Sequence, residues 1–379
     1  MRGIYLTDYD TKDTYSGVCK KICTQVKSFE NNGINIDLID INSIEIKPIS
    51  LLWDQLSALF GYNNFDKWSR LLDVLENKLL SEYFDFIYIR KPLFDSHQIR
   101  YFMRIKQKYP NIKLLFEIPT FPYDNEVRLS QRLKLRNEKR LRSHFKEFID
   151  GFVTYSKDKN IFGVPAINIS NGIDYNLIKA RQPKQHEGIN VIAVALFEDW
   201  HGYDRFIDGM IKQRDIVIER NINLFLAGKG RILSQYKEKA KKYRLTDHIH
   251  FCGELHNEQL DDLYQYADIA LDCMGRHRVG IFYNSSLKGK EYCAYGVPII
   301  SGIETELDTL QDFQYYKRIP ADDTLVDMND VVDYYKSIYS RMNPSEVVMT
   351  IRHLSQLKFD NIRAFKPVID FVLKNGSNK

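Results

Sequence analysis

Residues 284–300 hold the best candidate for a binding site, because a helix there begins with a cap and carries a carboxylate. Ser285 or Ser286 can cap this helix, and Gly296 ends it. The unpaired main-chain N–H groups and the positive dipole end of a helix N-terminus suit a diphosphate. Glu291, about two turns into the helix, can accept hydrogen bonds from both hydroxyls of a ribose. Taken alone, the same pattern also fits an exposed glutamate that binds nothing.

Two other groups have the form of metal or thiol sites, and we assign neither to a metal. Asp8-Tyr9-Asp10 follows a predicted strand and favours a turn, and Cys19 and Cys23 lie four residues apart as packed thiols on one helix face. Neither a Cys-x2-Cys pair nor a His-Glu-x-x-His motif occurs. We therefore expect no metal and no cofactor.

Composition places the chain among globular proteins of ordinary size. Its 379 residues suggest two domains, and 44% hydrophobic residues supply packed cores. A formal charge of +4 does not indicate a nucleic-acid binder. No apolar stretch approaches the ~18 residues that a membrane span needs, and Asp8 arrives too early for the apolar core of a signal peptide. We expect a cytoplasmic protein.

Short apolar runs alternate with amphipathic segments along the whole chain, which predicts strand–helix–strand units and parallel sheets. A first series of strands runs from Ile4 to Ile169, and a second series begins at Val191. The polar segment 178–188 lies between them as a linker. We predict an α/β fold of two doubly wound domains, residues 1–182 and 183–358, with a last helix at 359–375. Such sheets bind ligands beyond the carboxyl ends of their strands, and two facing domains make a cleft.

Five segments resemble motifs of the glycosyltransferases of group 1, the large retaining group with GT-B architecture that assembles bacterial polysaccharides. The helix reads Leu-Lys-x-x-Glu-Tyr-x-Ala-x-Gly-x-Pro, and an Asn-Gly-Ile-Asp signature precedes the linker. The other three are an N-terminal glycine loop, an element like Lys-Gly-x-Asp, and a Gly-x-Gly turn. Along the chain, the glycine loop is at 15–18, the Asn-Gly-Ile-Asp signature at 170–174, the Lys-Gly-x-Asp-like element at 200–205, the Gly-x-Gly turn at 227–230 and the helix motif at 286–298.

The resemblance implies two Rossmann-like domains facing across a cleft, with the last helix packing back on the first domain. It implies a metal-independent hexosyltransferase that moves a sugar from a UDP- or GDP-sugar to a lipid-linked or oligosaccharide acceptor, with retention. Glu291 falls at the position that contacts the ribose. Gly17 and Gly228 would let the backbone approach the nucleotide. The acceptor is expected against the first domain.

Cleavage of a sugar–diphosphate bond builds negative charge on the leaving oxygen, so fixed cations and amide donors are needed beside the phosphates. The candidates, including the amides at the start of the helix, are Lys229, Arg231, Arg276, Arg278, Ser286, Leu287 and Lys288. Arg276 and Arg278 follow a strand at its carboxyl end. Lys290, by contrast, is expected to face solvent.

Two positions depart from the family pattern. The first glutamate of the family's acidic pair falls at Tyr283, where Tyr283 or Asn284 offers a hydrogen bond but no charge. His201 stands where lysine is common, and a neutral imidazole donates a hydrogen bond without adding a cation. These departures leave open a non-catalytic protein that binds a sugar nucleotide and supports a partner enzyme.

The first domain carries two further candidates. Glu117 or Asp124 can orient or deprotonate an acceptor hydroxyl, or each can be a salt-bridged structural residue. Residues 127–148 contain eight cations with leucines and phenylalanines at helical spacing, which indicates a basic amphipathic helix. Such a helix can bind an anionic membrane surface or be an ordinary solvated face. The aromatic insertion at 51–80 favours core packing, sugar stacking or membrane contact.

Overall fold

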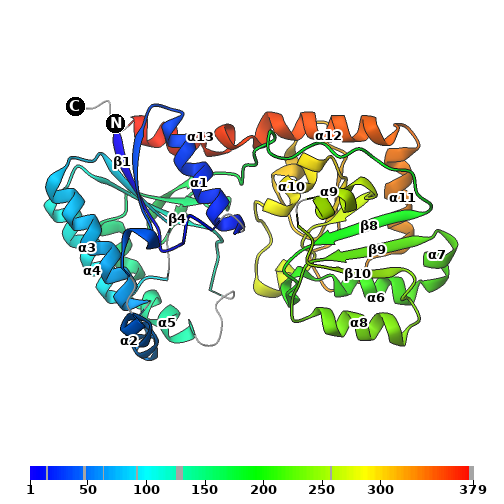
Figure 1. Ribbon diagram of the computed structural model, residues 1–379, viewed down its shortest axis with the longest axis horizontal. Coiled ribbons are helices and arrows are strands. Elements are labelled where there is room, and N and C mark those ends of the chain that lie inside the picture. The colour runs from blue at the N-terminus through cyan, green and yellow to red at the C-terminus, as the bar shows by residue number, and fades with distance from the viewer. Residues whose placement is uncertain are drawn as a thin grey trace. The chain divides into compact units, whose positions relative to one another are not determined.

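The computed structural model describes residues 1–13, 16–45, 48–62, 64–90, 93–124, 131–256 and 258–374, with residues 48–52 and 59 described by backbone only. The chain divides into two compact units (Figure 1). Unit 1 comprises Met1–Ser170 and the segment from Ala364 onward, and unit 2 comprises Asn171–Arg363. Each unit is an α/β domain built on one sheet.

Unit 1 has a seven-stranded sheet in the order β2-β1-β3-β4-β5-β7-β6, parallel except for the β6–β7 pair. Its strands are β1 (Arg2–Leu6), β2 (Asn35–Ile39), β3 (Phe86–Arg90), β4 (Lys113–Ile118), β5 (Gly151–Thr154), β6 (Asn160–Ile161) and β7 (Val164–Asn168). Its helices are α1 (Gly17–Glu30), η1 (Ile41–Ser43), α2 (Pro48–Leu59), α3 (Phe65–Ser81), α4 (Ser96–Lys108), α5 (Arg132–Leu141), η3 (Arg142–Glu147) and α13 (Asn361–Lys374).

The two faces of this sheet have separate cores, because successive side chains on a strand point to opposite sides. In β1, Ile4 and Leu6 belong to the core that α3 and α4 complete, whereas Tyr5 belongs to the core that α1 and α13 complete. All three residues are fully buried. A strand buried on both faces reads as a continuous apolar run, which is why the sequence revealed it.

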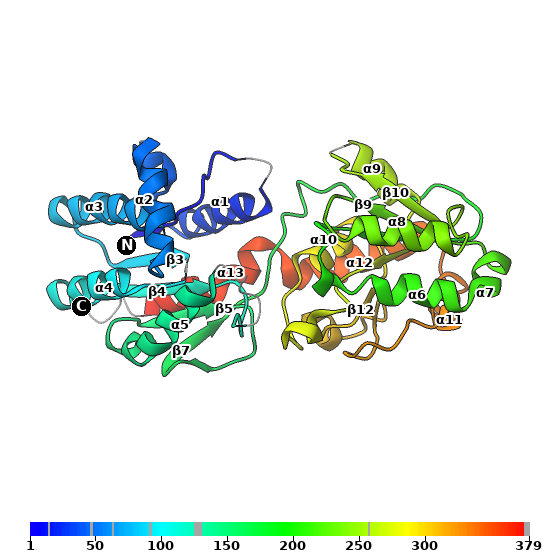
Figure 2. The ribbon, with the colours of Figure 1, turned by 90° about the horizontal axis from the view of Figure 1, so that it is seen from below.

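Unit 2 has a six-stranded parallel sheet in the order β10-β9-β8-β11-β12-β13. Its strands are β8 (Ile189–Val194), β9 (Ile222–Ala227), β10 (Ile249–Gly253), β11 (Ile269–Leu271), β12 (Ile299–Ser301) and β13 (Tyr316–Arg318). Its helices are η4 (Asp199–His201), α6 (Asp204–Lys212), α7 (Arg214–Glu219), α8 (Leu233–Lys242), α9 (Glu258–Gln265), η5 (Arg276–Val279), α10 (Leu287–Tyr295), η6 (Glu306–Thr309), α11 (Met328–Tyr339) and α12 (Pro344–Phe359). In Figures 1 and 2, α6 and α8 lie on one face of this sheet and α10 and α12 on the other.

The division between the units falls at residue 170, earlier than the linker at residue 182 that the sequence suggested. Residues 171–182 belong to unit 2 because they are bonded to it: the Arg181 Nε donates to the Gly296 carbonyl at 3.3 Å, and Ile173 pairs with Asp360. The last helix expected at 359–375 is α13 (Asn361–Lys374), which contributes Phe365 and Val368 to the core of unit 1.

The basic segment at 127–148 is not one long helix. Residues 125–130 lie outside the described residues, and the α-helix runs only from Arg132 to Leu141 before the short 3-10 helix η3. Two of the eight expected surface cations point inward: Lys134 is buried, and Arg142 pairs with Asp124 and Glu138. Among the described residues, no helix has both the length and the apolar character that a bilayer crossing requires.

Candidate functional site

The strand order of unit 2 places a ligand-binding edge between β8 and β11. β8 and β11 are neighbours in the sheet. After β8 the chain continues to β9 on one side, and after β11 it continues to β12 on the other side, so the strand order reverses between them. Their carboxyl ends carry the segments 195–203 and 272–279. Such a switch point is where open α/β sheets bind ligands. The expected residues His201 and Arg276 both lie on these two segments.

Two glycines bring these segments together. Gly202 has φ +69°, and a Cβ built on it would lie 2.4 Å from the Gly275 nitrogen. The Met274 N–H donates to the His201 carbonyl at 2.7 Å, which fixes the approach. The glycine in the expected Lys-Gly-x-Asp element is therefore required by backbone packing as well as by its left-handed conformation.

We expect Gly202→Ala to destabilise the protein by about 3 kcal/mol, combining left-handed strain with a backbone clash. Gly253→Ala is the matched control, because Gly253 has φ +70° but no described atom within 4 Å of its Cβ position. It should cost only about 1 kcal/mol. Urea unfolding of both variants checks the difference, and equal losses would show that the contact between the segments contributes nothing.

His201 is a neutral hydrogen-bond donor in this structure. Its Nδ1 accepts the Glu198 main-chain N–H at 3.1 Å, so the proton of the neutral ring is on Nε2. The ring stacks on Tyr203 with centroids 5.6 Å apart. Burial, reinforced by Lys288 and Arg276, lowers the pKa of His201 to about 2. The residue therefore supplies an N–H donor rather than a cation near neutral pH.

The N-terminus of α10 is capped as the sequence predicted. Ser286 Oγ accepts the Gly289 N–H at 3.2 Å and donates to Asp272 Oδ1 at 2.8 Å. Lys288 Nζ lies 3.2 Å from the Tyr203 hydroxyl and 3.9 Å from Asp272. Asp272 is fully buried, and its Oδ2 has no hydrogen-bond partner among the described residues. Asp272 was not selected from the sequence. Its position directly after β11 is the signal that could have identified it, because ligands bind beyond the carboxyl ends of parallel strands.

The exposed strip of α10 consists of the residues that were expected to bind a nucleotide. Leu287 is 38% exposed, Lys288 and Glu291 are partly exposed, and the remainder of the helix is buried. Positions 287, 288 and 291 lie on one side of a helix. Glu291 therefore shares a face with Lys288 near the capped end.

The expectation that Lys290 faces solvent is wrong. Its side chain is fully buried, its Nζ lies 2.8 Å from Glu306 Oε2, and it sits 4.0 Å from the centre of the Phe359 ring. The helix pattern misled because α10 is covered on almost every side, so an inward position carries a charge that is paired internally.

Asn171 connects the Asn-Gly-Ile-Asp signature to the start of α10. Its main-chain N–H donates to Ser285 Oγ at 2.8 Å, and its Nδ2 donates to the Ser285 carbonyl at 2.5 Å. The two most specific motifs of the sequence thus meet within unit 2. Their association orients the segment that caps the helix.

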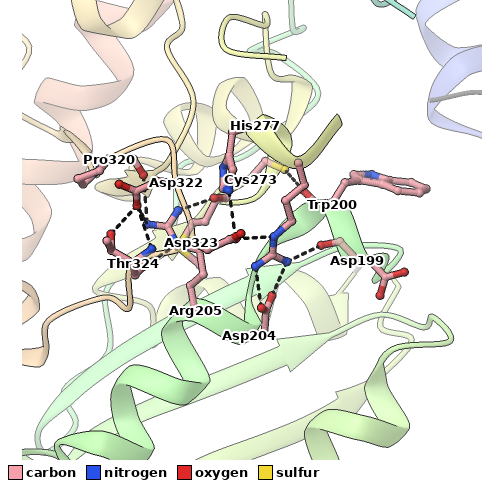
Figure 3. Close-up of polar contacts among 12 residues, drawn as sticks. Asp199, Trp200, Asp204, Arg205, Cys273, His277, Pro320, Asp322, Asp323 and Thr324 are labelled. Atoms are coloured by element: carbon pink, nitrogen blue, oxygen red, sulfur yellow. Dashed lines mark hydrogen bonds and ion pairs between the residues drawn. The ribbon is translucent and has the colours of Figure 1, made fainter. Parts of the chain in front are cut away.

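Arg278 does not have the free guanidinium that a phosphate ligand needs. Its Nη1 and Nη2 bind both oxygens of Asp204 at 3.0 and 2.8 Å, and its Nε binds Asp323 at 2.7 Å. Asp204 and Asp323 are labelled in Figure 3, where His277 also contacts Asp323, at 3.1 Å. The geometry argues against the expected catalytic role of Arg278 and favours a structural one.

Arg205 is a buried neighbour of this network that the sequence did not single out. It is 1% exposed and donates to the main-chain carbonyls of Met274 at 2.5 Å, Thr324 at 2.7 Å and Pro320 at 3.1 Å (Figure 3). These bonds join the segment after β11, which holds Met274, to the segment after β13, which holds Pro320 and Thr324. The acceptors of Arg205 lie 69 to 119 residues away in sequence, so no local sequence pattern predicts that its side chain is buried.

The expected phosphate cations after β9 lie on the surface and are paired. Lys229, with a side chain 67% exposed, lies 2.9 Å from Glu254. Arg231, 71% exposed, contacts Glu198 at 3.1 Å and Asp199 at 2.6 Å. Exposed pairs of this kind exchange readily with solvent and contribute little to stability, so both side chains can change partners.

The Gly-x-Gly turn is explained by packing. Cβ atoms built on Gly228 and Gly230 would lie 1.9 Å from the Ala195 oxygen and 2.1 Å from the Phe197 oxygen. Both glycines also have positive φ angles, +131° and +156°. The turn passes directly over the backbone that follows β8, and no side chain fits between them.

Tyr283 and Asn284 lie beside an acidic segment. Tyr283 forms a parallel bridge with Glu304, and the Asn284 N–H donates to the Glu304 carbonyl at 3.0 Å. Burial raises the pKa of Tyr283, with further contributions from Glu306 and Glu304. A glutamate at position 283 would add a carboxylate beside these two, which gives a physical reason for the departure from the family pattern.

In unit 1, Glu117 is the centre of a buried polar cluster. Its carboxylate accepts hydrogen bonds from Arg90 at 2.5 Å, Tyr88 at 2.7 Å, Gln25 at 2.9 Å and Tyr155 at 3.1 Å. Glu117 is 0% exposed. A general base must reach the proton that it removes, so this placement argues against that role.

Charge around Glu117 shifts two pKa values. Burial alone would raise the pKa of Glu117, but Arg90 and Lys21 outweigh burial and hold it at about 2. Burial lowers the pKa of Lys21 to about 7, against the opposing effect of Glu117 at 3.6 Å. The other acceptor-side candidate, Asp124, is held by Arg142 at 2.6 Å and by Lys139.

The expected N-terminal glycine loop is only partly described. Tyr15 lies outside the described residues, and Ser16 caps α1 by accepting the Cys19 N–H at 3.3 Å. Gly17 is the first residue of α1, and no described atom lies within 4 Å of its Cβ position. Within the described ranges, no group of three or more His, Cys, Asp or Glu side chains is arranged to hold a metal ion.

Part of the chain is similar in sequence to known proteins. Residues 174–305 match the family model described as "Glycosyl transferases group 1". Mannosylfructose-phosphate synthase of Agrobacterium fabrum is 33% identical over 95 residues, which are 24% of this chain and 21% of that protein. The match therefore spans about a fifth of the relative's length.

Solved structures match over the whole chain at low identity. Sucrose-phosphate synthase of Thermosynechococcus elongatus has a TM-score of 0.67 at 13% identity and covers 100% of both chains. A glycosyltransferase of Rickettsia africae ESF-5 has a TM-score of 0.66 at 12% identity, covering 100% of this chain and 99% of the other. Anabaena HepE in complex with UDP has a TM-score of 0.62 at 10% identity, covering 99% of this chain and 100% of its own. The chain has the GT-B fold of two Rossmann-like domains, and the match over residues 174–305 supports a place among the group 1 glycosyltransferases.

Proposed function

We propose that the protein is a retaining glycosyltransferase that moves a hexosyl unit from a UDP- or GDP-sugar to a lipid-linked or oligosaccharide acceptor. The observation that carries this proposal is the exposed strip of α10, where Lys288 and Glu291 lie beside a capped helix N-terminus. Lys288 contacts the hydroxyl of Tyr203, and His201 stacks on the ring of the same tyrosine. The UDP bound by the Anabaena neighbour supports a nucleotide donor.

In this proposal the donor's diphosphate lies at the N-terminus of α10. The free amides of Leu287 and Lys288 and the side chains of Lys288 and Arg276 stabilise the charge of the leaving phosphate. His201 donates from Nε2 to a phosphate or sugar oxygen. Glu291 accepts hydrogen bonds from the ribose hydroxyls. Because these groups supply fixed positive charge and donors, we propose a reaction that needs no metal ion.

The proton of the acceptor hydroxyl needs a destination other than the carboxylates of Glu117 and Asp124. Glu117 is buried, and Asp124 is held by two cations. We therefore propose that an oxygen of the departing diphosphate takes the proton. The C–O bond to the leaving phosphate breaks, the acceptor oxygen forms the new bond on the same face of the sugar, and the nucleoside diphosphate leaves protonated.

The biological setting is proposed from the neighbours and the surface. A lipopolysaccharide outer core galactosyltransferase, WaaB, shares the fold with a TM-score of 0.59. We propose a role in polysaccharide or glycoconjugate synthesis, in the cytoplasm and at the inner face of the plasma membrane. A second candidate is a non-catalytic subunit that binds a sugar nucleotide, which the tyrosine at position 283 favours.

Release of nucleoside diphosphate from UDP- and GDP-hexoses, with and without lipid-linked or oligosaccharide acceptors, tests the proposal. Acceptor-dependent release supports a transferase, and the anomeric configuration of the product, read by proton NMR, decides retention. A thermal shift with nucleoside diphosphates in the absence of turnover would instead support the binding subunit. Neither shift nor turnover with any of these compounds contradicts both candidates.

Glu291→Ala should weaken the binding of the preferred nucleoside diphosphate about 10- to 100-fold, the loss typical for a hydrogen bond to a charged group. Glu238→Ala, at an exposed position of α8, is the control and should bind normally. Isothermal titration calorimetry measures both. Unchanged affinity in Glu291→Ala would remove Glu291 from the nucleotide site.

A further inference from the structure

Helix α2 presents an apolar stripe to solvent. Trp53, Leu56 and Phe60 are 57%, 43% and 73% exposed. They lie three and four residues apart, so they share one face of the helix and of the turn that follows it. The next helix behaves in the opposite way, because Trp68 of α3 is 1% exposed within the core. The stripe is therefore not part of the core that the aromatic insertion was expected to fill.

The stripe continues onto α5. Gly61, two residues beyond the end of α2, lies against this helix, since a Cβ at Gly61 would be 3.3 Å from Leu133 Cγ and also in contact with Asn137. Leu133 is itself 42% exposed. Figures 1 and 2 both show the end of α2 reaching α5. An apolar row thus joins two segments that are 73 residues apart between Phe60 and Leu133.

Cations surround this row on α5. Arg132, Arg136, Lys139 and Arg140 are all exposed. The acidic residue of the same helix, Glu138, is buried and accepts the Phe94 N–H at 2.7 Å, so it does not reduce the charge of the outer surface. Four of the five cations of α5 are therefore exposed, whereas Lys134 and the carboxylate of Glu138 are buried.

We propose that this surface binds an anionic lipid bilayer. We call it the α2–α5 face and define it by Trp53, Leu56, Phe60, Leu133, Arg132, Arg136, Lys139 and Arg140. Exposed aromatic and aliphatic side chains insert at the boundary between headgroups and acyl chains, and adjacent arginines and lysines bind lipid phosphates. A contiguous row of exposed apolar side chains is rare on a protein surface that contacts only water, and it usually marks an interaction site. The exposed cations beside the row favour an anionic partner. The inference deepens the proposed location at the plasma membrane, because it names the surface that binds the bilayer, and vesicle binding can be tested without sugar transfer.

Vesicle sedimentation of the full chain tests the proposal. Vesicles of phosphatidylglycerol mixed with phosphatidylcholine are compared with phosphatidylcholine alone, at low and high salt. Arg136→Ser/Arg140→Ser should lower partitioning to the anionic vesicles by roughly 25-fold, about fivefold per cation. Trp53→Ser/Phe60→Ser should lower it at least about tenfold, including at high salt. Arg142 and Lys139 are left unaltered in this variant because both pair with Asp124, so replacing them would also disturb unit 1.

Matched controls separate the face from general properties of the surface. Lys237→Ser/Lys241→Ser removes two exposed cations of α8, and Leu177→Ser/Met349→Ser removes two side chains that are 81% and 63% exposed. Both should partition like the unaltered protein. As a second readout, the fluorescence of Trp53 should shift to the blue with anionic vesicles, and it is followed in a chain whose Trp200 is replaced by Phe.

Several results would overturn the proposal. The protein would fail to sediment with anionic vesicles, the control variants would lose as much partitioning as the face variants, or the emission of Trp53 would not shift. A concentration-dependent dimer that Phe60→Ser abolishes, without vesicle binding, would assign the face to a second copy of the chain instead. Circular dichroism of each variant shows that a loss of binding does not come from unfolding.

Discussion

Lys290→Ala should lower the free energy of unfolding of the protein by about 3–5 kcal/mol, because it leaves the nearly buried carboxylate of Glu306 without its cation. The Lys290 side chain is fully buried between Glu306 at 2.8 Å and the ring of Phe359. Removing it also leaves a cavity between α10 and the end of α12. Urea unfolding followed by circular dichroism measures the loss.

A double variant distinguishes the ion pair from simple packing. Lys290→Met/Glu306→Leu should lose less stability than either single variant, because no unpaired charge remains in the interior. Lys241→Ala, on the exposed face of α8, is the control. A change in Lys290→Ala as small as that of the control would place the side chain at the surface and restore the interpretation made from the helix pattern.

Glu117→Ala should destabilise unit 1 by about 3–5 kcal/mol, since the Arg90 guanidinium would remain buried without its counter-charge. The Tyr88 and Tyr155 hydroxyls and the Gln25 amide would lose an acceptor as well. Chemical denaturation of Glu117→Ala measures this loss, with the exposed Glu147→Ala as the control. A Glu117→Ala protein that keeps its stability but loses only transferase activity would show a catalytic carboxylate instead.

The same cluster predicts sensitivity to acid. The pKa of Glu117 is about 2 in the folded protein against 4.5 as its ordinary value. A carboxyl group with a lowered folded pKa contributes stability above the ordinary value and loses it as the pH falls toward the folded value. The stability gap between the unaltered protein and Glu117→Ala should therefore narrow between pH 4.5 and pH 2.

The fold was largely predictable because its signal is local. Strands such as β1 and β4 are buried on both faces, so their apolar residues run without interruption and are visible in any short window. β13 was not predicted, because it is three residues long and only partly buried. The sequence placed the domain boundary near residue 182, whereas the units divide at residue 170. The hydrogen bonds that attach residues 171–182 to unit 2 involve residues more than 100 positions away, so no local pattern shows them.

The candidate site was predictable in place but less so in detail. Strand ends, a cap and a glutamate on one helix face can be read from the sequence. Lys288 and Glu291 share the exposed face of α10, and His201 stacks on the tyrosine whose hydroxyl Lys288 contacts. What a cation contacts cannot be read in this way. Arg278 and Lys288 looked alike, yet Asp204 and Asp323 hold the first, whereas the second remains beside the switch point.

The return of α13 to unit 1 has a consequence for biosynthesis. Phe365, Val368, Ile369 and Val372 cover one side of the first sheet, where they contact rings such as Phe29 and Tyr88. On the ribosome, all of unit 2 is made before these four residues. Until then, the part of this face that α13 covers stays exposed, although α1 already packs on the same side. Exposed apolar surface of this kind is what chaperones bind during synthesis.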